Sequence, residues 1–423
     1  MNRNLRLILA AFMVFVFGTD TFAQDPSTLD KIRQARFVSS SPREASLGLL
    51  HYSDLHGDDT SVQKLLSYIS DYAPYIDAVI NTGDAVHYYA DASEDYPNGA
   101  GWWRGTDLAE KTLFVLGNHD GAEKSEEKGY REGSADWDFK GKAWDFDQYF
   151  SDYAGTLGYV FPDGYDNPSS PYYKSCFWHK DFESARIRII GLDCVHFNES
   201  FRYVTGEQEE WLTARLVETL DPGSAVCGYS VIVVCHYPLD DFKGDNESWD
   251  EAAHRFVFNK NPKGGRVMDG RTGAVTNFHY YGLNGYTANK RFSLRSRVAT
   301  ADAQYGYQSG PDNPFGDIIQ AWVDKGGKFV VWLSGHCHAD MLYYPEKYPG
   351  LLCLAIDQAG NLRGNNVAAR EDGTESRVCA NYYSVDTQNG LFKIVRLGLP
   401  RDRFLIGKDV FCYDYLNRVV VFE

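Results

Sequence analysis

The sequence is short of positive charge. Its 423 residues include 42 Lys and Arg against 58 Asp and Glu, and the formal net charge at pH 7 is −16. Proteins bind nucleic-acid backbones largely by neutralising phosphates with Lys and Arg. Because an acidic surface repels polyanions, we expect no nucleic acid as the main partner of this protein.

The sequence also lacks a hydrophobic run of the roughly 20 residues that span a membrane. An apolar run near the N-terminus, from Leu7 to Phe17, is too short for this purpose. Arg3 and Arg6 precede the run and Thr21-Phe22-Ala23 follows it, a pattern typical of a secretory signal peptide. We therefore expect residues 1–23 to be removed on export and the protein to be periplasmic or extracellular. An uncleaved anchor is the second interpretation.

The cysteines do not form an evident disulfide framework, although an exported chain permits one. Three of the eight lie in or beside apolar stretches, where a thiol behaves as a small hydrophobic group: Cys194, Cys235 and Cys337. Three others lie toward the C-terminus, where pairing stays open: Cys353, Cys379 and Cys412.

Apolar runs of strand length alternate with helical patterns through much of the chain. The predicted strands are Leu47–Tyr52, Ile76–Ile80, Thr112–Leu116, Ile187–Leu192, Ser230–Val234 and Phe329–Leu333. Helices are predicted over about 207–220 and about 314–324. This alternation predicts an α/β fold with a largely parallel sheet, which binds ligands beyond the carboxyl ends of its strands.

Two long stretches interrupt the alternation, at about 122–185 and about 239–312. Both are rich in Gly, Asp, Asn and aromatic residues. Ordered loops of this length are usually functional, so we interpret them as walls of a cleft. One α/β domain is expected over 24–345, and the β-rich remainder, 346–423, is expected to complete a second sheet.

Polar residues follow five of the predicted strands. The five blocks are Asp54-x-His56, Gly83-Asp84, Gly117-Asn118-His119-Asp120, His236, and Gly335-His336-x-His338. Each block alone has an ordinary explanation, such as a helix cap or a turn. Together they are expected to converge on one edge of a sheet. Their side chains are imidazoles, carboxylates and one carboxamide, a set of ligands that suits Zn, Mn, Fe or Co better than Ca.

The five blocks, in this order, resemble the signature of the calcineurin-like metallophosphoesterases. The resemblance implies a two-sheet β-sandwich core flanked by helices, with two metal ions at the catalytic site. By this resemblance the first metal is held by Asp54, His56 and His338, and the second by Asn118, His236 and His336. Asp84 is then the bridging ligand, His119 the catalytic histidine, and Asp120 the residue that orients it.

The chemistry of such a site is phosphoric ester hydrolysis. Two metals about 3.5 to 4 Å apart can share a hydroxide and hold the phosphoryl oxygens while it attacks in line. We therefore expect an exported phosphodiesterase or phosphatase that acts on a small phosphorylated molecule. His87 and His196 are candidates for substrate contact, and each is equally compatible with a packed or solvated side chain.

Two alternatives stay open at this point. One is a non-catalytic protein that binds metal or ligand on the same fold. The other is an exported nuclease, against which the net charge argues.

Overall fold

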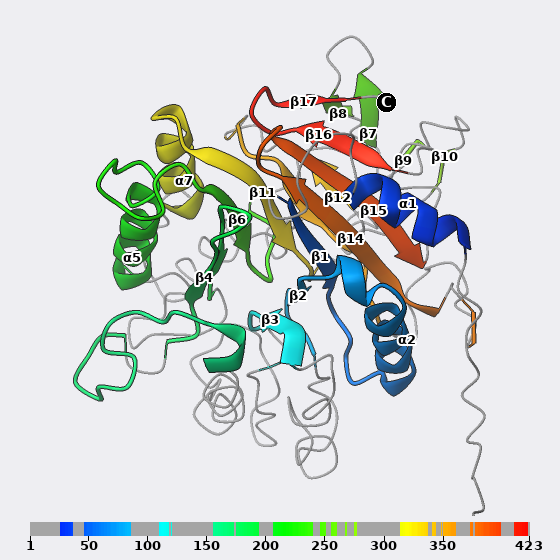
Figure 1. The fold of residues 1–423 in the computed structure, drawn as a ribbon, viewed down its shortest axis with the longest axis horizontal. Helices are drawn as coiled ribbons and strands as arrows, with labels where there is room; N and C mark the ends of the chain where they lie inside the picture. The colour runs from blue at the N-terminus through cyan, green and yellow to red at the C-terminus, as the bar shows by residue number, and fades with distance from the viewer. Residues whose placement is uncertain are drawn as a thin grey trace, which may run out of the picture.

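Two β-sheets form the centre of the molecule (Figure 1). The computed structural model describes residues 26–36, 46–85, 110–117, 120, 155–172, 175–193, 206–239, 246–250, 255–259, 267–268, 275–276, 314–336, 341–343, 348, 350–360, 373–374, 377–398 and 410–421. Residues 1–23, the expected signal peptide, lie outside these ranges. Among the described residues, no helix has the length and apolar character needed to cross a membrane.

The first sheet has seven strands in the order β17-β16-β15-β14-β1-β2-β3. These strands are β1 (Ser46–Tyr52), β2 (Ala78–Asn81), β3 (Thr112–Phe114), β14 (Cys379–Asp386), β15 (Leu391–Gly398), β16 (Phe411–Asp414) and β17 (Val419–Val420). Strands β1, β2 and β3 run parallel, whereas β14 pairs with β1 in the antiparallel sense. The largely parallel arrangement predicted from the sequence therefore holds for one half of this sheet only.

The second sheet has six strands in the order β12-β13-β11-β6-β5-β4. These are β4 (Trp178–Phe182), β5 (Ile187–Gly191), β6 (Ser230–Val234), β11 (Lys328–Ser334), β12 (Met341–Tyr343) and β13 (Cys353–Ala355). The four inner strands are parallel and the two edge strands are antiparallel to their neighbours. Nearly every residue of β5, β6 and β11 is buried, as expected for strands covered on both faces.

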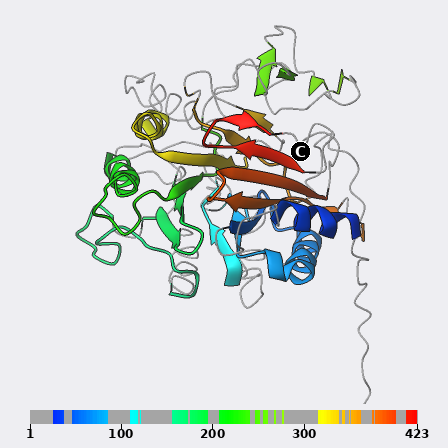
Figure 2. The same ribbon diagram turned by 45° about the horizontal axis from the view of Figure 1, so that its top comes forward.

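Helices flank the pair of sheets, which confirms the predicted fold class. Figures 1 and 2 show α1 (Pro26–Arg36) and α2 (Asp59–Asp71) on one side, and α5 (Gly206–Val217) with α7 (Pro314–Asp324) on the other. The short helix η2 (Ala73–Tyr75) follows α2. Two small ladders complete the described elements: β7 (Asn246–Asp250) with β8 (Arg255–Asn259), and β9 (Val267–Met268) with β10 (Val275–Thr276).

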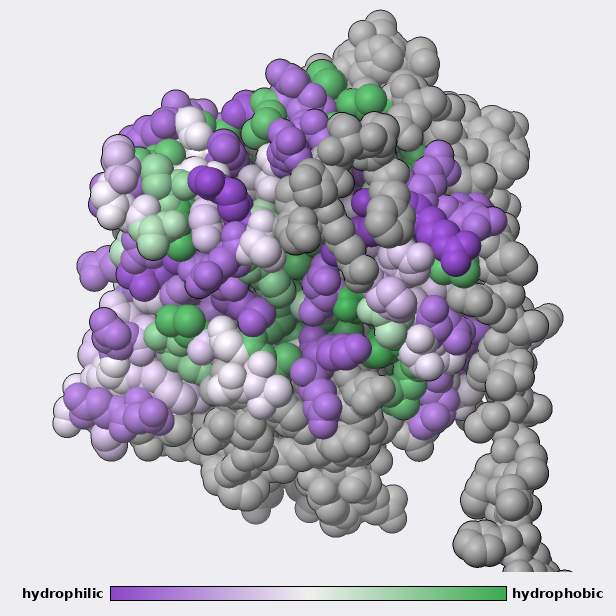
Figure 3. Space-filling model, in the orientation of Figure 1, coloured by the Kyte–Doolittle hydropathy of each residue, from purple (hydrophilic) through white to green (hydrophobic). Residues whose placement is uncertain are grey.

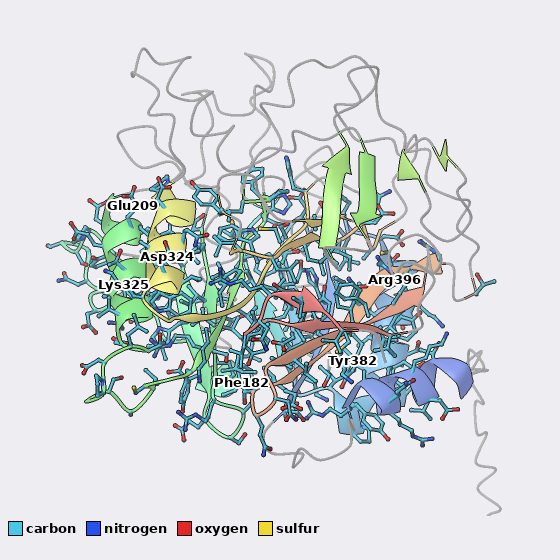
Figure 4. All side chains as sticks on the ribbon, turned by 90° about the horizontal axis from the view of Figure 1, so that it is seen from above. Phe182, Glu209, Asp324, Lys325, Tyr382 and Arg396 are labelled. Atoms are coloured by element: carbon cyan, nitrogen blue, oxygen red, sulfur yellow. The ribbon has the colours of Figure 1, made fainter. Side chains whose placement is uncertain are left out.

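Figure 4 shows the described side chains on the flanking helices and on the sheets. In Figure 4, Glu209 is labelled on α5 and Asp324 and Lys325 at the end of α7, whereas Tyr382 and Arg396 lie among the strands of the first sheet. The described part of the surface in Figure 3 is mostly hydrophilic, and its hydrophobic residues form small separate groups.

Buried aromatic residues connect the two sheets. Trp178 of β4 donates from its indole Nε1 to the carbonyl oxygen of Phe114 in β3, at 2.9 Å. The hydroxyl of Tyr159 accepts from the Phe114 amide at 3.0 Å and donates to the Thr112 carbonyl at 3.1 Å. Because β3 is an edge strand, these side chains bond backbone groups that no further strand covers.

The six cysteines of the described residues form no disulfide. Cys353, Cys379 and Cys412, for which pairing was open, lie buried as thiols on β13, β14 and β16. Cys235 is also a buried thiol, at the end of β6. Cys194 and Cys337 lie outside the described residues.

Acid should destabilise the protein through His179. Burial, followed by the charge of Arg188, lowers the pKa of His179 from 6.5 to about 4. Below pH 6.5 the unfolded chain therefore binds a proton that the folded chain does not bind, and the free energy of unfolding falls as the pH falls. The expected loss between pH 7 and pH 4 is up to about 3 kcal/mol.

Urea unfolding at several pH values tests this expectation. His179→Phe keeps an aromatic ring beside Trp211 and removes the titrating group, so its free energy of unfolding should depend less on pH between 7 and 4. Tyr229→Phe is the control, because Tyr229 does not titrate in this interval. Equal pH dependence in wild type and His179→Phe would contradict the expectation.

Candidate metal centre

Four strands from the two sheets deliver polar residues to one place. Asp54 and His56 follow β1, and Asp84 follows β2 in the first sheet. His236 follows β6, and His336 follows β11 in the second sheet. The structure brings these five residues together, and all are buried except for the half-buried His336.

The ligand atoms form two groups that share one carboxylate. Asp54, His56 and Asp84 make one group, and Asp84, His236 and His336 make the other; within each group the atoms lie within 4.8 Å of one another. The His56 Nε2 atom is 3.8 Å from Asp54 Oδ1 and 4.0 Å from Asp84 Oδ2. The His236 Nε2 atom is 3.4 Å from the same Asp84 oxygen. Asp84 is thus placed between two potential cation positions.

The backbone conformation is unusual at these residues. Asp54, His56, Asp84 and His336 have φ values of 54°, 50°, 54° and 66°. The left-handed region costs a residue with a Cβ roughly 1–2 kcal/mol, and such strain persists only where the surroundings hold it. Only two other described residues with a side chain share this conformation, and both lie in turns between paired strands: Arg186 and Arg418.

Backbone hydrogen bonds tie the first two loops to each other. The amide of Asp54 donates to the Gly83 carbonyl at 2.9 Å, and the amide of His56 donates to the Asp84 carbonyl at 3.0 Å. The Gly57 amide continues this ladder to the Ala85 carbonyl at 2.9 Å. The pairing of β1 and β2 therefore continues past the strand ends and fixes the spacing of the two carboxylates.

The carboxylate of Asp120 holds the Asp84 loop from the other side. Its oxygens accept hydrogen bonds from the amides of Asp84, Ala85 and Gly117, at 2.8, 2.8 and 2.7 Å. Asp120 is fully buried, and three donors compensate the cost of burying its charge. The expected role of Asp120 in orienting His119 stays a prediction, because His119 lies outside the described residues.

A backbone contact determines the tautomer of His236. Its Nδ1–H donates to the carbonyl oxygen of Thr82 at 2.7 Å, which leaves the lone pair on Nε2. This Nε2 atom is 3.1 Å from His336 Nδ1. Two nitrogens bound to one ion at about 2.0–2.1 Å, with an angle of about 90–110°, lie roughly 2.9–3.4 Å apart. The spacing of the two imidazoles therefore fits a shared metal ion.

The local charge favours a cation. Burial acts to lower the pKa of His236, but the charge of Asp84, its hydrogen bond to Asp84 and the charge of Asp54 outweigh this effect and raise the pKa to about 9. A buried site that holds a proton so strongly also attracts a metal ion, which would replace that proton. With imidazoles and carboxylates as donors, the residues present fit a transition metal centre.

One further segment contacts the site, although the sequence did not predict it. After β13 the chain turns back, and the amides of Ala359 and Gly360 donate to the carbonyls of Ser53 and Asp54, at 2.8 and 3.0 Å. A Cβ at Gly360 would collide with the Leu55 carbonyl oxygen, so this approach requires glycine. No sequence motif marks the segment.

The family model for calcineurin-like phosphoesterases matches residues 47–264, more than half of the chain. The chain belongs to this family. Together with the grouped ligand atoms, this membership identifies a metal-dependent phosphoester hydrolase. His336 and the strands from β11 onward lie beyond the matched residues.

Solved structures with a related arrangement are distant in sequence. The chain is similar to a dimetal phosphatase from Danio rerio, with 9% identity, a TM-score of 0.39, and coverage of 87% of this chain and 99% of that chain. It is also similar to the purple acid phosphatase PPD1 from yellow lupin seeds, with 11% identity, a TM-score of 0.43, and coverage of 90% and 55%. No curated protein matches the sequence.

For this calcineurin-like phosphoesterase, five predicted site residues lie outside the described residues. They are Asn118 and His338 among the expected metal ligands, His119 as the expected catalytic residue, and His87 and His196 as candidates for substrate contact. Their positions stay predictions from the sequence.

Gly117 provides a test of the geometry around Asp84. A Cβ at Gly117 would collide with the carboxylate and the backbone nitrogen of Asp84. Gly117→Ala should therefore displace the shared carboxylate and weaken metal binding at least about 10-fold, as changes beside metal ligands do. Gly206→Ala is the matched control, because a Cβ at Gly206 meets no atom within 4 Å.

Metal binding to the two variants is measured by competition with a chromogenic chelator. Circular dichroism of both proteins shows whether they are folded. Unchanged affinity in folded Gly117→Ala would show that the position of Asp84 does not control metal binding.

Proposed function

We propose that this protein is an exported dinuclear-metal phosphoesterase that hydrolyses a phosphomonoester or phosphodiester of a small molecule. The observation that carries the proposal is the position of Asp84, whose carboxylate belongs to both groups of ligand atoms. A net charge of −16 favours a small phosphorylated substrate over a long polyanion. Export is supported by the signal-peptide pattern of residues 1–23.

The two groups of residues suit two ions. Asp54 and His56 would hold one ion, His236 and His336 the other, and Asp84 would bridge them. The family resemblance adds His338 to the first and Asn118 to the second. Zn, Mn, Fe and Co all match these donors. When bound, such ions supply positive charge for the phosphoryl oxygens and activate water as the nucleophile.

The protein's own groups position this chemistry. Asp84 is held in place by the amide contacts of its loop with Asp120 and with the loop after β1. His236 presents Nε2 because its Nδ1–H is bonded to the Thr82 carbonyl. By resemblance, His119 stabilises the transition state or donates a proton to the leaving oxygen.

The proposal predicts that Asp84→Asn removes activity. The amide cannot supply the negative charge that two cations share, so turnover should fall at least about 100-fold. Hydrolysis of p-nitrophenyl phosphate and bis(p-nitrophenyl) phosphate is measured for the mature protein with added Mn, Zn, Co or Fe. Asp163→Asn, at an exposed position, is the control for the chemical change.

The outcomes separate the alternatives. Activity retained by Asp84→Asn would contradict the proposed site. Protein that binds two metal ions but hydrolyses neither ester nor other small phosphoesters would favour a non-catalytic binding protein. Cleavage of single-stranded or duplex DNA at low salt with Mn would favour a nuclease. The better of the two esters identifies the class of substrate.

A further inference from the structure

A part-buried ion pair joins the C-terminal part of the chain to the loop after β1. The guanidinium of Arg377 donates from Nη2 to both carboxylate oxygens of Asp58, at 2.5 and 2.6 Å. Its Nη1 donates to the Ser61 hydroxyl oxygen at 3.0 Å. Arg377 is only 5% exposed, and burial makes each partner depend on the other. The pair spans 319 positions of the sequence.

Asp58 ends the turn that carries His56. Its amide donates to the Leu55 carbonyl at 3.1 Å, which closes a four-residue turn. The two central residues, His56 and Gly57, have φ values of 50° and 72°. This conformation is free of strain for glycine but strained for His56. The turn therefore needs outside contacts to hold the imidazole in place.

Asp58 is also the N-cap of α2. Its side chain accepts a hydrogen bond from the Ser61 amide at 3.1 Å and caps the helix. One carboxylate thus joins the turn of His56, the first turn of α2 and Arg377. We therefore expect a change at Arg377 to shift this carboxylate and, with it, the end of the turn.

A second set of contacts reaches the same loop. The Ser61 hydroxyl, which accepts from Arg377, donates to the Ala359 carbonyl at 2.8 Å. The Ala359 amide in turn bonds to the Ser53 carbonyl at 2.8 Å. Arg377 is therefore connected to both ends of the loop from Ser53 to Asp58, by side chains at one end and through the backbone at the other.

The contact that holds His236, in the other group of ligand atoms, is different. His236 is held by the Thr82 carbonyl, whereas the amide of His336 donates to the carboxylate of Asp54, in the first group, at 3.0 Å. Arg377 donates hydrogen bonds to Asp58 and Ser61. A disturbance at Arg377 should therefore affect Asp54 and His56 more than His236.

We propose that Arg377 is a positioning residue for the half of the metal centre formed by Asp54, His56 and Asp84, and that it acts through Asp58. The proposal rests on the proposed function, because it assumes two metal ions. It assigns a role in the active site to the C-terminal part of the chain, which lies beyond the residues matched by the family model.

Metal titration of the full mature chain tests this role. Wild type should bind two Zn or Mn ions per chain. Arg377→Ala should weaken one of the two about 10- to 100-fold, as the loss of a group supporting a metal ligand does. The affinity of the other ion should change less than about 3-fold, so the two binding steps separate in a titration with a competing chelator.

Two milder variants keep the test decisive where Arg377→Ala folds poorly. Arg377→Lys keeps the positive charge. Lysine lacks the planar guanidinium group, so it cannot bind Asp58 and Ser61 at the same time. Asp58→Asn keeps the helix cap, since Asn also caps well, and removes the charge that faces Arg377. Both should weaken the same single ion, and activity at low metal concentration should recover when metal is added in excess.

Arg188→Ala is the matched control. Arg188 is also buried, at 2% exposure, and donates from Nε and Nη2 to the two oxygens of Asp181 at 2.7 and 2.8 Å. It lies on β5 and donates to the carbonyl oxygen of Arg215 in α5 and to the carboxylate of Glu218 just after α5, and none of these partners is a candidate ligand. The control should lose thermal stability and keep both metal affinities.

Each outcome has a distinct meaning. Two unchanged metal affinities in a folded Arg377 variant that is merely less stable, like the control, would overturn the positioning role and leave the proposed function intact. Equal weakening of both ions would also overturn it. Wild-type protein that binds no metal would overturn the proposed function itself.

Discussion

Three hydrogen bonds to one buried carboxylate hold the arrangement on which the site depends. Asp120 binds the amides of Asp84, Ala85 and Gly117, and so joins the loop after β2 to the loop after β3. Asp84 has a left-handed backbone that would relax without such contacts. Because the loop after β1 is bonded in turn to the Asp84 loop, the order imposed by Asp120 extends to Asp54 and His56.

The meeting of two sheets at this point explains why one carboxylate can serve two groups of ligands. The first sheet supplies Asp54, His56 and Asp84 at the ends of neighbouring parallel strands. The second sheet supplies His236 and His336, likewise from neighbouring parallel strands. Parallel strands place their carboxyl ends at the same edge, so the residues supplied by each sheet lie side by side. The packing of the sheets then brings His236 and His336 close to Asp84.

The C-terminal part of the chain belongs to the same unit as the site. β14 and β15 extend the first sheet on the far side of β1, and the segment after β13 contacts the loop that carries Asp54. Arg377 precedes β14 and bonds to Asp58, 319 positions away in the sequence. A region without any motif of its own thus supports the residues that the motifs mark.

The sequence by itself determined the fold class and the polar residues at the strand ends, because hydrophobic periodicity and strand-end motifs are local. The predicted ranges at 207–220 and 314–324 correspond to α5 and α7, and each of the five described ligand candidates follows a predicted strand. Tertiary structure alone decided that β1 pairs with β14, that the Asp120 carboxylate accepts hydrogen bonds from three backbone amides, and that Arg377 faces Asp58. Such contacts join residues as far apart in the sequence as Ser46 and Asp386, and no local pattern encodes them, since they form only when the whole chain buries its core.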